Sequence, residues 1–208
     1  INMLIDDTTY KLGVNNYNQI KTNKKLIVLG NTHTVNMNHY IGWGFRFGGK
    51  YKNTAHYTIL VDGTVYNHYD TDYYSDVFNI PSLDKQSIFI LLENVGVLTK
   101  SKNNNEYYTW IGDIYNGVDI IDKKWRSEKY WASYSDSQLK SAIDLCDELC
   151  VKHSIPKLVV PHNIKLDNLK DYSGILYKSN INTKYLDITP AWDFKEFKEK
   201  IENTNYEI

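Results

Sequence analysis

The chain has 208 residues, which fits one compact domain, and its 42% hydrophobic and 24% charged residues are ordinary for a globular protein. Its formal net charge of −1 argues against a protein that binds nucleic acid through bulk electrostatics. No apolar run approaches the length of a membrane span, and the first residues lack a secretory signal pattern, so we expect no membrane partner.

The N-terminal part predicts a polar lead-in followed by a buried strand. Residues 1–24 are polar and are expected to be extended, and the domain proper is expected to span residues 25–208. The continuous apolar run at 25–29 has the length of a strand and ends at Gly30. The segment 35–47 is expected to hold a short helix that the following glycines close.

A hairpin and a second buried strand follow. Two alternating segments, 55–61 and 64–69, flank Asp62-Gly63, which is the strongest short-range signal of a β-hairpin. The apolar run 87–92 predicts another buried strand that leads into Glu93.

Residues 96–134 lack a clean periodicity and are rich in aromatic residues. We expect a long, ordered excursion over one face of the domain, because so many aromatic side chains would not stay solvated. The aromatic residues are Tyr107, Tyr108, Trp110, Trp125, Tyr130 and Trp131.

The strongest helix signal follows. Ser135 and Gln138 form a capping box, apolar residues recur at helical spacing, and Pro156 comes after the end of the pattern. Cys146 and Cys150 lie on one face of this helix, where we interpret them as small apolar core residues rather than a disulfide or a metal pair.

The C-terminal part offers a histidine and a carboxylate. The run at 158–160 predicts a short strand that delivers His162 to its end, and residues 163–186 are expected to form a polar loop. Asp187 precedes a closing helix at 190–201, with Thr189 as the expected N-cap. Imidazole and carboxylate are ordinary zinc ligands. The alternative is a surface histidine and an aspartate that merely caps the helix.

Strands mixed with helices, one hairpin and one long helix predict an α/β fold. We expect a single domain in which a mixed central sheet is flanked by helices. No internal repeat or linker is apparent in the sequence.

The order of these elements resembles one known family. The segments that carry the resemblance are KLIVLGNTHT, NTAHYTILVDGTVYNHY, SIFILLENVG, YYTWIG with the long helix after it, and VVPHN with LDITPAWDF. Together they resemble the type 2 N-acetylmuramoyl-L-alanine amidases, which include peptidoglycan recognition proteins and phage endolysins. The resemblance covers the chain from about residue 25 to residue 201 and implies the peptidoglycan amidase fold.

The resemblance implies a zinc-dependent hydrolase that cuts the amide bond between N-acetylmuramic acid and L-alanine of the stem peptide. His162 and Asp187 would be two of three zinc ligands, and the metal would lower the pKa of its water and polarise the amide carbonyl. The first ligand position falls on Gly30, so His33 is the nearest substitute, provided that its loop curls back.

The family's catalytic glutamate falls on Leu91, and Glu93 lies two residues further on the same strand face. Glu93 is therefore the expected catalytic acid. Lys184 is the expected substitute for a lysine that the family places before its third ligand. Asp171 is a rival carboxylate in the long loop before Asp187. His39, His56, His68 and His153 are expected to be structural or surface residues.

The aromatic-rich excursion is expected to line the groove that binds the glycan and its peptide. The candidate substrate-binding residues are Trp110, Trp125, Arg126, Tyr130 and Trp131.

Two main functional hypotheses stay open on the sequence, beside the plainer hypothesis of an α/β hydrolytic domain of another class. The first is a phage-encoded endolysin, made in the host cytoplasm, that cleaves bacterial peptidoglycan and works beside other lysis or virion proteins. The second, which Gly30 and Leu91 favour, is an inactive amidase-fold domain that binds peptidoglycan or serves as a structural virion component.

Overall fold

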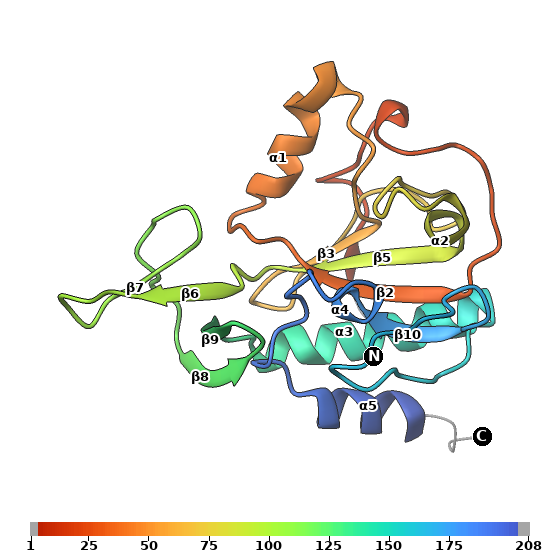
Figure 1. Ribbon diagram of the computed structural model, residues 1–208. Coiled ribbons are helices and arrows are strands. Elements are labelled where there is room, and N and C mark those ends of the chain that lie inside the picture. The colour runs from red at the N-terminus through yellow and green to blue at the C-terminus, as the bar shows by residue number, and fades with distance from the viewer. Residues whose placement is uncertain (1–3, 204–208) are drawn as a thin grey trace.

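The computed structural model describes residues 4–203, and a mixed sheet forms its centre (Figure 1). β2 pairs in parallel with both β5 and β10, whereas β3 and β4 pair antiparallel. The predicted α/β class with a mixed central sheet is thus confirmed. The sheet has the order β1 (Ile5–Asp6), β4 (Val65–Asn67), β3 (Tyr57–Ile59), β5 (Ser87–Leu92), β2 (Leu26–Asn31) and β10 (Gly174–Tyr177).

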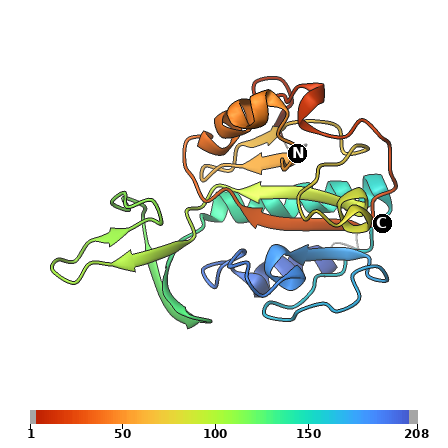
Figure 2. The same ribbon diagram turned by 45° about the horizontal axis from the view of Figure 1, so that its top comes forward.

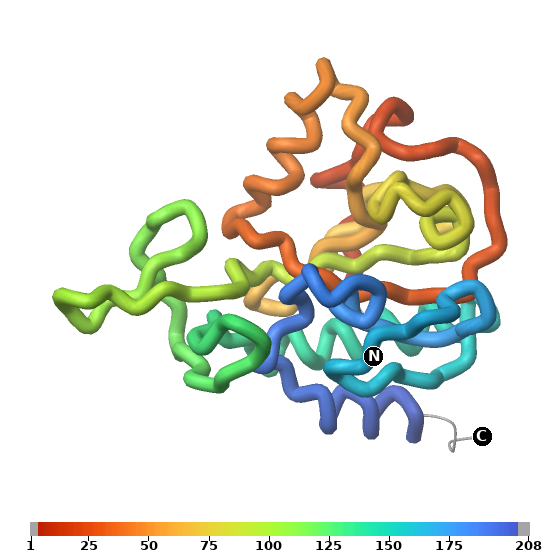
Figure 3. The backbone as a smooth tube through the Cα atoms, viewed as in Figure 1, coloured from red at the N-terminus to blue at the C-terminus, as the bar shows by residue number. Residues whose placement is uncertain are grey.

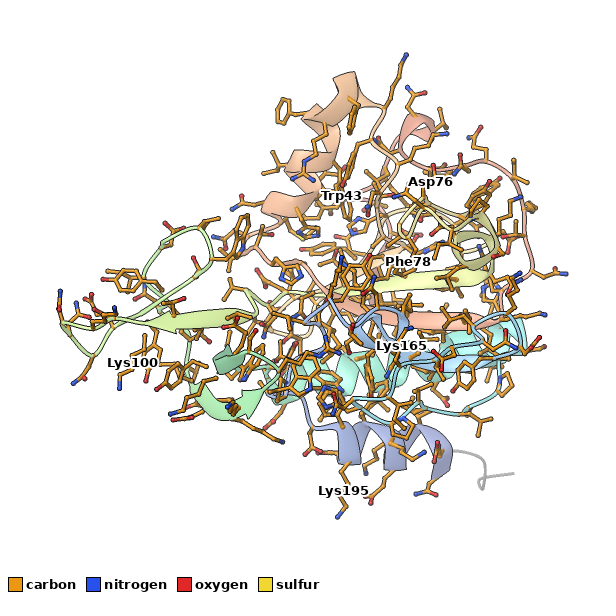
Figure 4. The ribbon with its side chains drawn as sticks, viewed as in Figure 1. Trp43, Asp76, Phe78, Lys100, Lys165 and Lys195 are labelled. Atoms are coloured by element: carbon orange, nitrogen blue, oxygen red, sulfur yellow. The ribbon has the colours of Figure 1, made fainter. Side chains whose placement is uncertain are left out.

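Both faces of the central strands are buried, because helices cover each side (Figure 2). On one side Ile27 and Leu29 of β2 pack against α3 (Asp136–His153) and α5 (Phe194–Asn203). On the other side the alternate β2 residues, Leu26 and Val28, pack toward α1 (Asn38–Phe45) and α2 (Pro81–Gln86). Trp43 and Phe78 belong to this second cluster and lie on the α1 side of the sheet in Figure 4.

Several sequence predictions are confirmed here. Ser135 caps α3, its hydroxyl accepting a hydrogen bond from the Gln138 N–H at 3.0 Å, and the capping box is complete. Cys146 and Cys150 are free thiols buried in the first core cluster. At the Asp62-Gly63 turn, a Cβ on Gly63 would lie 2.9 Å from the Ser137 carbonyl oxygen, so glycine lets the hairpin approach α3.

The aromatic-rich excursion differs from the prediction. Instead of covering a face, it forms its own antiparallel sheet that projects to one side of the molecule (Figures 1 and 2). Its strands, in sheet order, are β7 (Tyr107–Tyr108), β6 (Val97–Lys100), β9 (Glu128–Ala132) and β8 (Ile120–Trp125). Trp131 is 0% exposed, and its indole N–H donates to the Lys123 carbonyl at 2.7 Å, so this side chain is a core residue of the projecting sheet.

The C-terminal elements also need correction. The run at 158–160 supplies only an isolated bridge between Val159 and Ile175, and the true edge strand is β10, inside the stretch predicted to be a polar loop. All four residues of β10 pair with β2, which explains why so short a run is a strand. α5 begins at Phe194, where Asp193 accepts the Glu196 N–H at 2.8 Å, so Thr189 is not its N-cap.

Shorter elements complete the fold. The N-terminal segment is more than a lead-in, because β1 pairs with β4 at the edge of the sheet. The remaining elements are the 3₁₀ helices η1 (Val14–Asn16) and η2 (Arg46–Gly49) and the short helix α4 (Lys178–Ile181). Within residues 4–203, none of the helices combines the length and apolarity that a membrane crossing requires.

Burial of the histidines predicts a loss of stability in acid. Desolvation lowers the pKa of all six histidines, including that of His39 to about 3, that of His68 to about 4, and that of fully buried His56. The unfolded chain, with a histidine pKa of about 6.5, then binds more protons than the folded chain below that pH. The free energy of unfolding should therefore fall between about pH 6.5 and about pH 4, by up to about 1.4 kcal/mol per pH unit for each such histidine.

Urea unfolding at about pH 7, 6 and 5 measures this slope. The His68→Gln variant should be less stable at neutral pH and should show a shallower slope, since one proton-binding group is gone. A free energy of unfolding that stays constant over this range would contradict the assignment of neutral, buried histidines.

Candidate functional site

The carboxyl ends of three parallel strands meet at one edge of the central sheet. Gly30 of β2 pairs with Leu91 of β5, and Leu29 pairs with Tyr177, so Lys178 directly follows the neighbouring end of β10. After α4 (Lys178–Ile181) the chain returns to this edge, where Asp187 accepts a hydrogen bond from the backbone of β2. The backbone path of this C-terminal part is drawn in blue in Figure 3. Such an edge is where open α/β sheets place their ligand sites.

Asp187 is the buried charge at this edge. Its carboxylate is 1% exposed, and Oδ2 accepts the Asn31 N–H at 2.9 Å. Two basic side chains contact the same oxygen: His33 Nε2 lies at 3.8 Å and Lys178 Nζ at 3.9 Å. A buried carboxylate requires such partners, since desolvation of an unpaired charge is costly.

His33 reaches Asp187 because its loop curls back. Its backbone is in the left-handed region (φ 55°), and its N–H donates to the Asn94 carbonyl at 3.0 Å. Gly96 has φ +79°, and a Cβ there would lie 3.3 Å from His33 Nδ1, so the ring packs where a side chain is absent. Burial lowers the pKa of His33, the nearby Lys178 adds to this effect, and Asp187 opposes it.

Lys178 is a site residue that the sequence reasoning missed. Its side chain is 19% exposed, and Nζ lies 4.4 Å from the centroid of the Tyr185 ring and 6.0 Å from that of Phe89. The sequence signal was the apolar run Gly174–Tyr177, whose end would have placed Lys178 beside Gly30.

His162 does not join this centre. Its ring stacks on Phe194 at 3.9 Å between centroids and lies 4.7 Å from the Trp125 ring. Burial, with smaller effects of Lys123 and Arg126, lowers its pKa to about 4. In the described part of the chain His162 forms no ion pair with Asp187. A hydrogen bond with the Ile188 backbone places the ring beside the residue that follows Asp187. Its Nε2 is buried and has no hydrogen-bond partner among the described residues.

The other predicted catalytic residues lie apart from Asp187. Glu93 joins two loops, its oxygens accepting the Asn36 N–H at 2.8 Å and the Val61 N–H at 3.1 Å. Lys184 is exposed on the loop before Asp187, and Asp171 is exposed on the loop before β10. Leu91, at the family's glutamate position, is 6% exposed and packs in the second core cluster.

A groove of about 730 Å³ lies between the main domain and the projecting sheet, and it reaches the centre at His33. Trp110 lines it, is 65% exposed, and donates from Nε1 to the His33 carbonyl at 2.7 Å. The walls are largely apolar. They contain no lysine or arginine but include the carboxylates of Glu93, Asp113, Asp119 and Asp136.

Of the predicted substrate-binding residues, only Trp110 lines this groove. The Arg126 guanidinium stacks over Trp125 at 4.2 Å and donates to the carbonyls of Thr183 and Tyr185. It therefore holds the loop that carries Asp187. Tyr130 packs edge-on against Tyr107, and Trp131 is a core residue, so neither offers a face to the groove.

The residues at this edge do not fit a zinc ion. A catalytic zinc needs three protein donors, and among residues 4–203 no group of three or more His, Cys, Asp or Glu side chains is placed to hold a metal. At Gly30 a Cβ would lie 2.9 Å from Asp187 Oδ2 and 3.0 Å from the Phe89 ring, so that ring fills the space of a donor. A divalent ion about 4 Å from the Lys178 ammonium would meet a repulsion of about 8 kcal/mol at an effective dielectric constant of about 20.

Comparisons with known proteins agree with this fold. The sequence profile described as N-acetylmuramoyl-L-alanine amidase matches residues 16–173, which is more than half of the chain but ends before Lys178 and Asp187. No curated protein sequence matches the chain.

Two solved structures show the likeness in fold. The N-acetylmuramoyl-L-alanine amidase LysC from Clostridium intestinale URNW is 16% identical, with a TM-score of 0.51, over 96% of this chain and 97% of that one. A mutant endolysin from Bacillus subtilis is 15% identical, with a TM-score of 0.52, over 96% of this chain and 99% of that one.

The close packing at Gly30 predicts a specific cost of adding a methyl group there. The Gly30→Ala variant should lose about 1–3 kcal/mol of unfolding free energy, because the new Cβ overlaps Asp187 and the Phe89 ring. Gly44→Ala is the matched control, since nothing lies within 4 Å of its missing Cβ, and it should be neutral or stabilising. Equal stability of the two variants in urea unfolding would contradict the close packing, because it would show that a methyl group fits at position 30.

Proposed function

Because this chain belongs to the N-acetylmuramoyl-L-alanine amidase family, we propose that it acts on bacterial peptidoglycan, at the amide bond between N-acetylmuramic acid and the L-alanine of the stem peptide. The observation that carries this proposal is the groove that is lined by His33, the residue that contacts Asp187 at the carboxyl edge of the sheet.

The groove suits a glycopeptide. Its volume lies in the range of ligand pockets, and its apolar walls and exposed Trp110 offer a face for a sugar ring or a peptide. Its carboxylates, without a lysine or arginine among them, complement a stem peptide that carries a free amino group. Substrate bound there would bring its reacting amide to His33.

Hydrolysis of this amide adds water to the carbonyl carbon and releases an amine. The reaction needs a positive or hydrogen-bonding group at the carbonyl oxygen and an acceptor for the proton of the water. His33 can accept that proton, because its lowered pKa keeps the imidazole neutral at pH 7. Asp187 fixes the ring, and Arg126 holds the Asp187 loop. No step is assigned to zinc, since the residues present do not fit it.

One observation favours a second candidate function, peptidoglycan binding without cleavage. Leu91 and Gly30, the paired positions at the ends of β5 and β2, carry no group that could donate, accept or ligate. A domain of this kind would retain the groove and hold the glycopeptide.

The setting we propose follows from the endolysin among the similar structures. A phage-encoded protein of this fold would be made in the host cytoplasm and act on the cell wall beside other lysis or virion proteins. Recovery of this chain from a phage lysate together with such proteins would support the setting.

The first test of the proposed function is the release of new amino termini. Purified cell walls incubated with the protein should yield soluble fragments with free N-terminal L-alanine, identified by mass spectrometry. The Asp187→Asn variant should be slower by about 100-fold or more, because a neutral amide neither orients His33 nor balances Lys178.

Asp167→Asn is the matched control, because this carboxylate is 90% exposed and its ion pair among the described residues is with exposed Lys165. Full activity of the Asp187→Asn variant would show that Asp187 and the groups around it take no part in the reaction. Protein that pellets with walls yet releases no alanine terminus would support the binding function instead.

The second test concerns the groove. Trp110→Ala should raise the KM or Kd for a soluble muropeptide by about tenfold, since the exposed indole that covers the groove is lost. Phe47→Ala, which removes an 80% exposed ring that does not line the groove, should leave the same constant unchanged. Equal effects of both variants, measured by calorimetry, would place substrate elsewhere.

A further inference from the structure

The Asp187 centre contains hydrogen-bond donors that the protein does not use. Among the described residues, the ammonium of Lys178 is in contact with one carboxylate oxygen and two aromatic rings, and it makes no hydrogen bond. Groups of this kind in a native protein require an explanation.

The unused N–H donors of the Lys178 ammonium indicate what kind of ligand atom it could bind. The Lys178 ammonium carries three N–H donors and cannot accept a hydrogen bond. They therefore match an oxygen atom with partial or full negative charge, such as a carbonyl oxygen. A metal cation is excluded from the same place by charge and by the lack of lone pairs.

The side chains packed around Lys178 hold its ammonium beside Asp187. The Phe89 ring fills the space beside Gly30 and lies within cation–π distance of Nζ, and the Tyr185 ring lies closer, on another side. Asp187 neutralises the ammonium and is itself almost inaccessible, whereas the Lys178 side chain is 19% exposed. The part of this ion pair that a ligand can reach is thus the cation.

We propose that the Lys178 ammonium is the resident cation of this centre and that it, rather than a metal ion, binds the carbonyl oxygen of the muramoyl-alanine amide. The identity of this amide rests on the proposed function above. Lys178 Nζ and His33 Nε2 lie 3.9 and 3.8 Å from the same Asp187 oxygen, so the ammonium and the imidazole flank one carboxylate, and His33 also lines the groove.

In the hydrolytic step the water oxygen bonds to the carbonyl carbon while one water proton passes to His33. Lys178 donates a hydrogen bond to the oxyanion and keeps its own proton. The carbon–nitrogen bond then breaks, and His33 returns the proton to the leaving nitrogen. The products are the muramic acid carboxylate and the amino group of L-alanine, with no other reactant.

The test combines metal content with ligand binding. Protein purified without a metal-affinity step should contain far less than one zinc per chain by mass spectrometry. Titration calorimetry with N-acetylmuramoyl-L-alanyl-D-glutamate should give the same Kd with and without a chelator. Lys178→Met should weaken binding by about tenfold or more, whereas Lys178→Arg, which keeps the charge, should retain much of it.

Lys165→Met is the matched control, because Lys165 is exposed on the loop before β10 (Figure 4) and should bind like the wild type. Urea unfolding verifies that each variant is folded. The metal content is measured on the wild-type protein, so this part of the test does not depend on the folding of any variant. One zinc per chain with chelator-sensitive binding would overturn the proposal, and so would wild-type affinity of folded Lys178→Met. Metal-free binding that depends on Lys178, without release of alanine termini, would support it while rejecting hydrolysis.

Discussion

The structure depends on one buried negative charge at the edge of a parallel sheet. Asp187 is almost inaccessible, so its carboxylate must be stabilised by groups that the fold brings to it. The Asn31 N–H, the His33 ring and the Lys178 ammonium come from the ends of β2 and β10, and Arg126 holds the loop from the projecting sheet. Three groups from the ends of β2 and β10 thus contact the same oxygen of Asp187.

The same edge explains how the chain combines a shared fold with an altered centre. The strands β2 and β5, the hairpin and the long helix α3 lie within the matched residues, and apolar side chains of all of them share one core cluster. The space next to Gly30 is filled by Phe89, and Leu91 is part of the core. The Phe89 ring and Leu91 stabilise the sheet by packing at these positions. Polar side chains there would lose their hydration, which costs free energy.

Much of the fold could be predicted from the sequence because the local signals agree with the final packing. The apolar runs of β2 and β5, the Asp-Gly hairpin and the capping box of α3 each specify one structure. β10 could not be predicted in this way. It has four residues between polar segments and is a strand because β2 offers it a partner, which is a tertiary effect.

The contact between His33 and Asp187 could be predicted from the sequence for the same reason. Asp187 and the curl of the His33 loop follow from residues near recognisable strands, whereas Lys178 lies at the end of the strand that was missed. His162 was predicted from a strand expected at 158–160 and from the family resemblance, and its ring packs on Phe194. Residue type indicates which chemistry is possible, but strand pairing decides which side chains meet.

The central claim is that the positive charge beside Asp187 belongs to Lys178. The most direct measurement is anomalous diffraction at the zinc absorption edge, from crystals of this protein grown with zinc in the solution. We expect no anomalous peak within about 2 Å of the Asp187 oxygens, the distance at which zinc binds carboxylates, and we expect density for the Lys178 ammonium in contact with Asp187. A zinc peak at that distance, with Lys178 displaced from the carboxylate, would contradict the account.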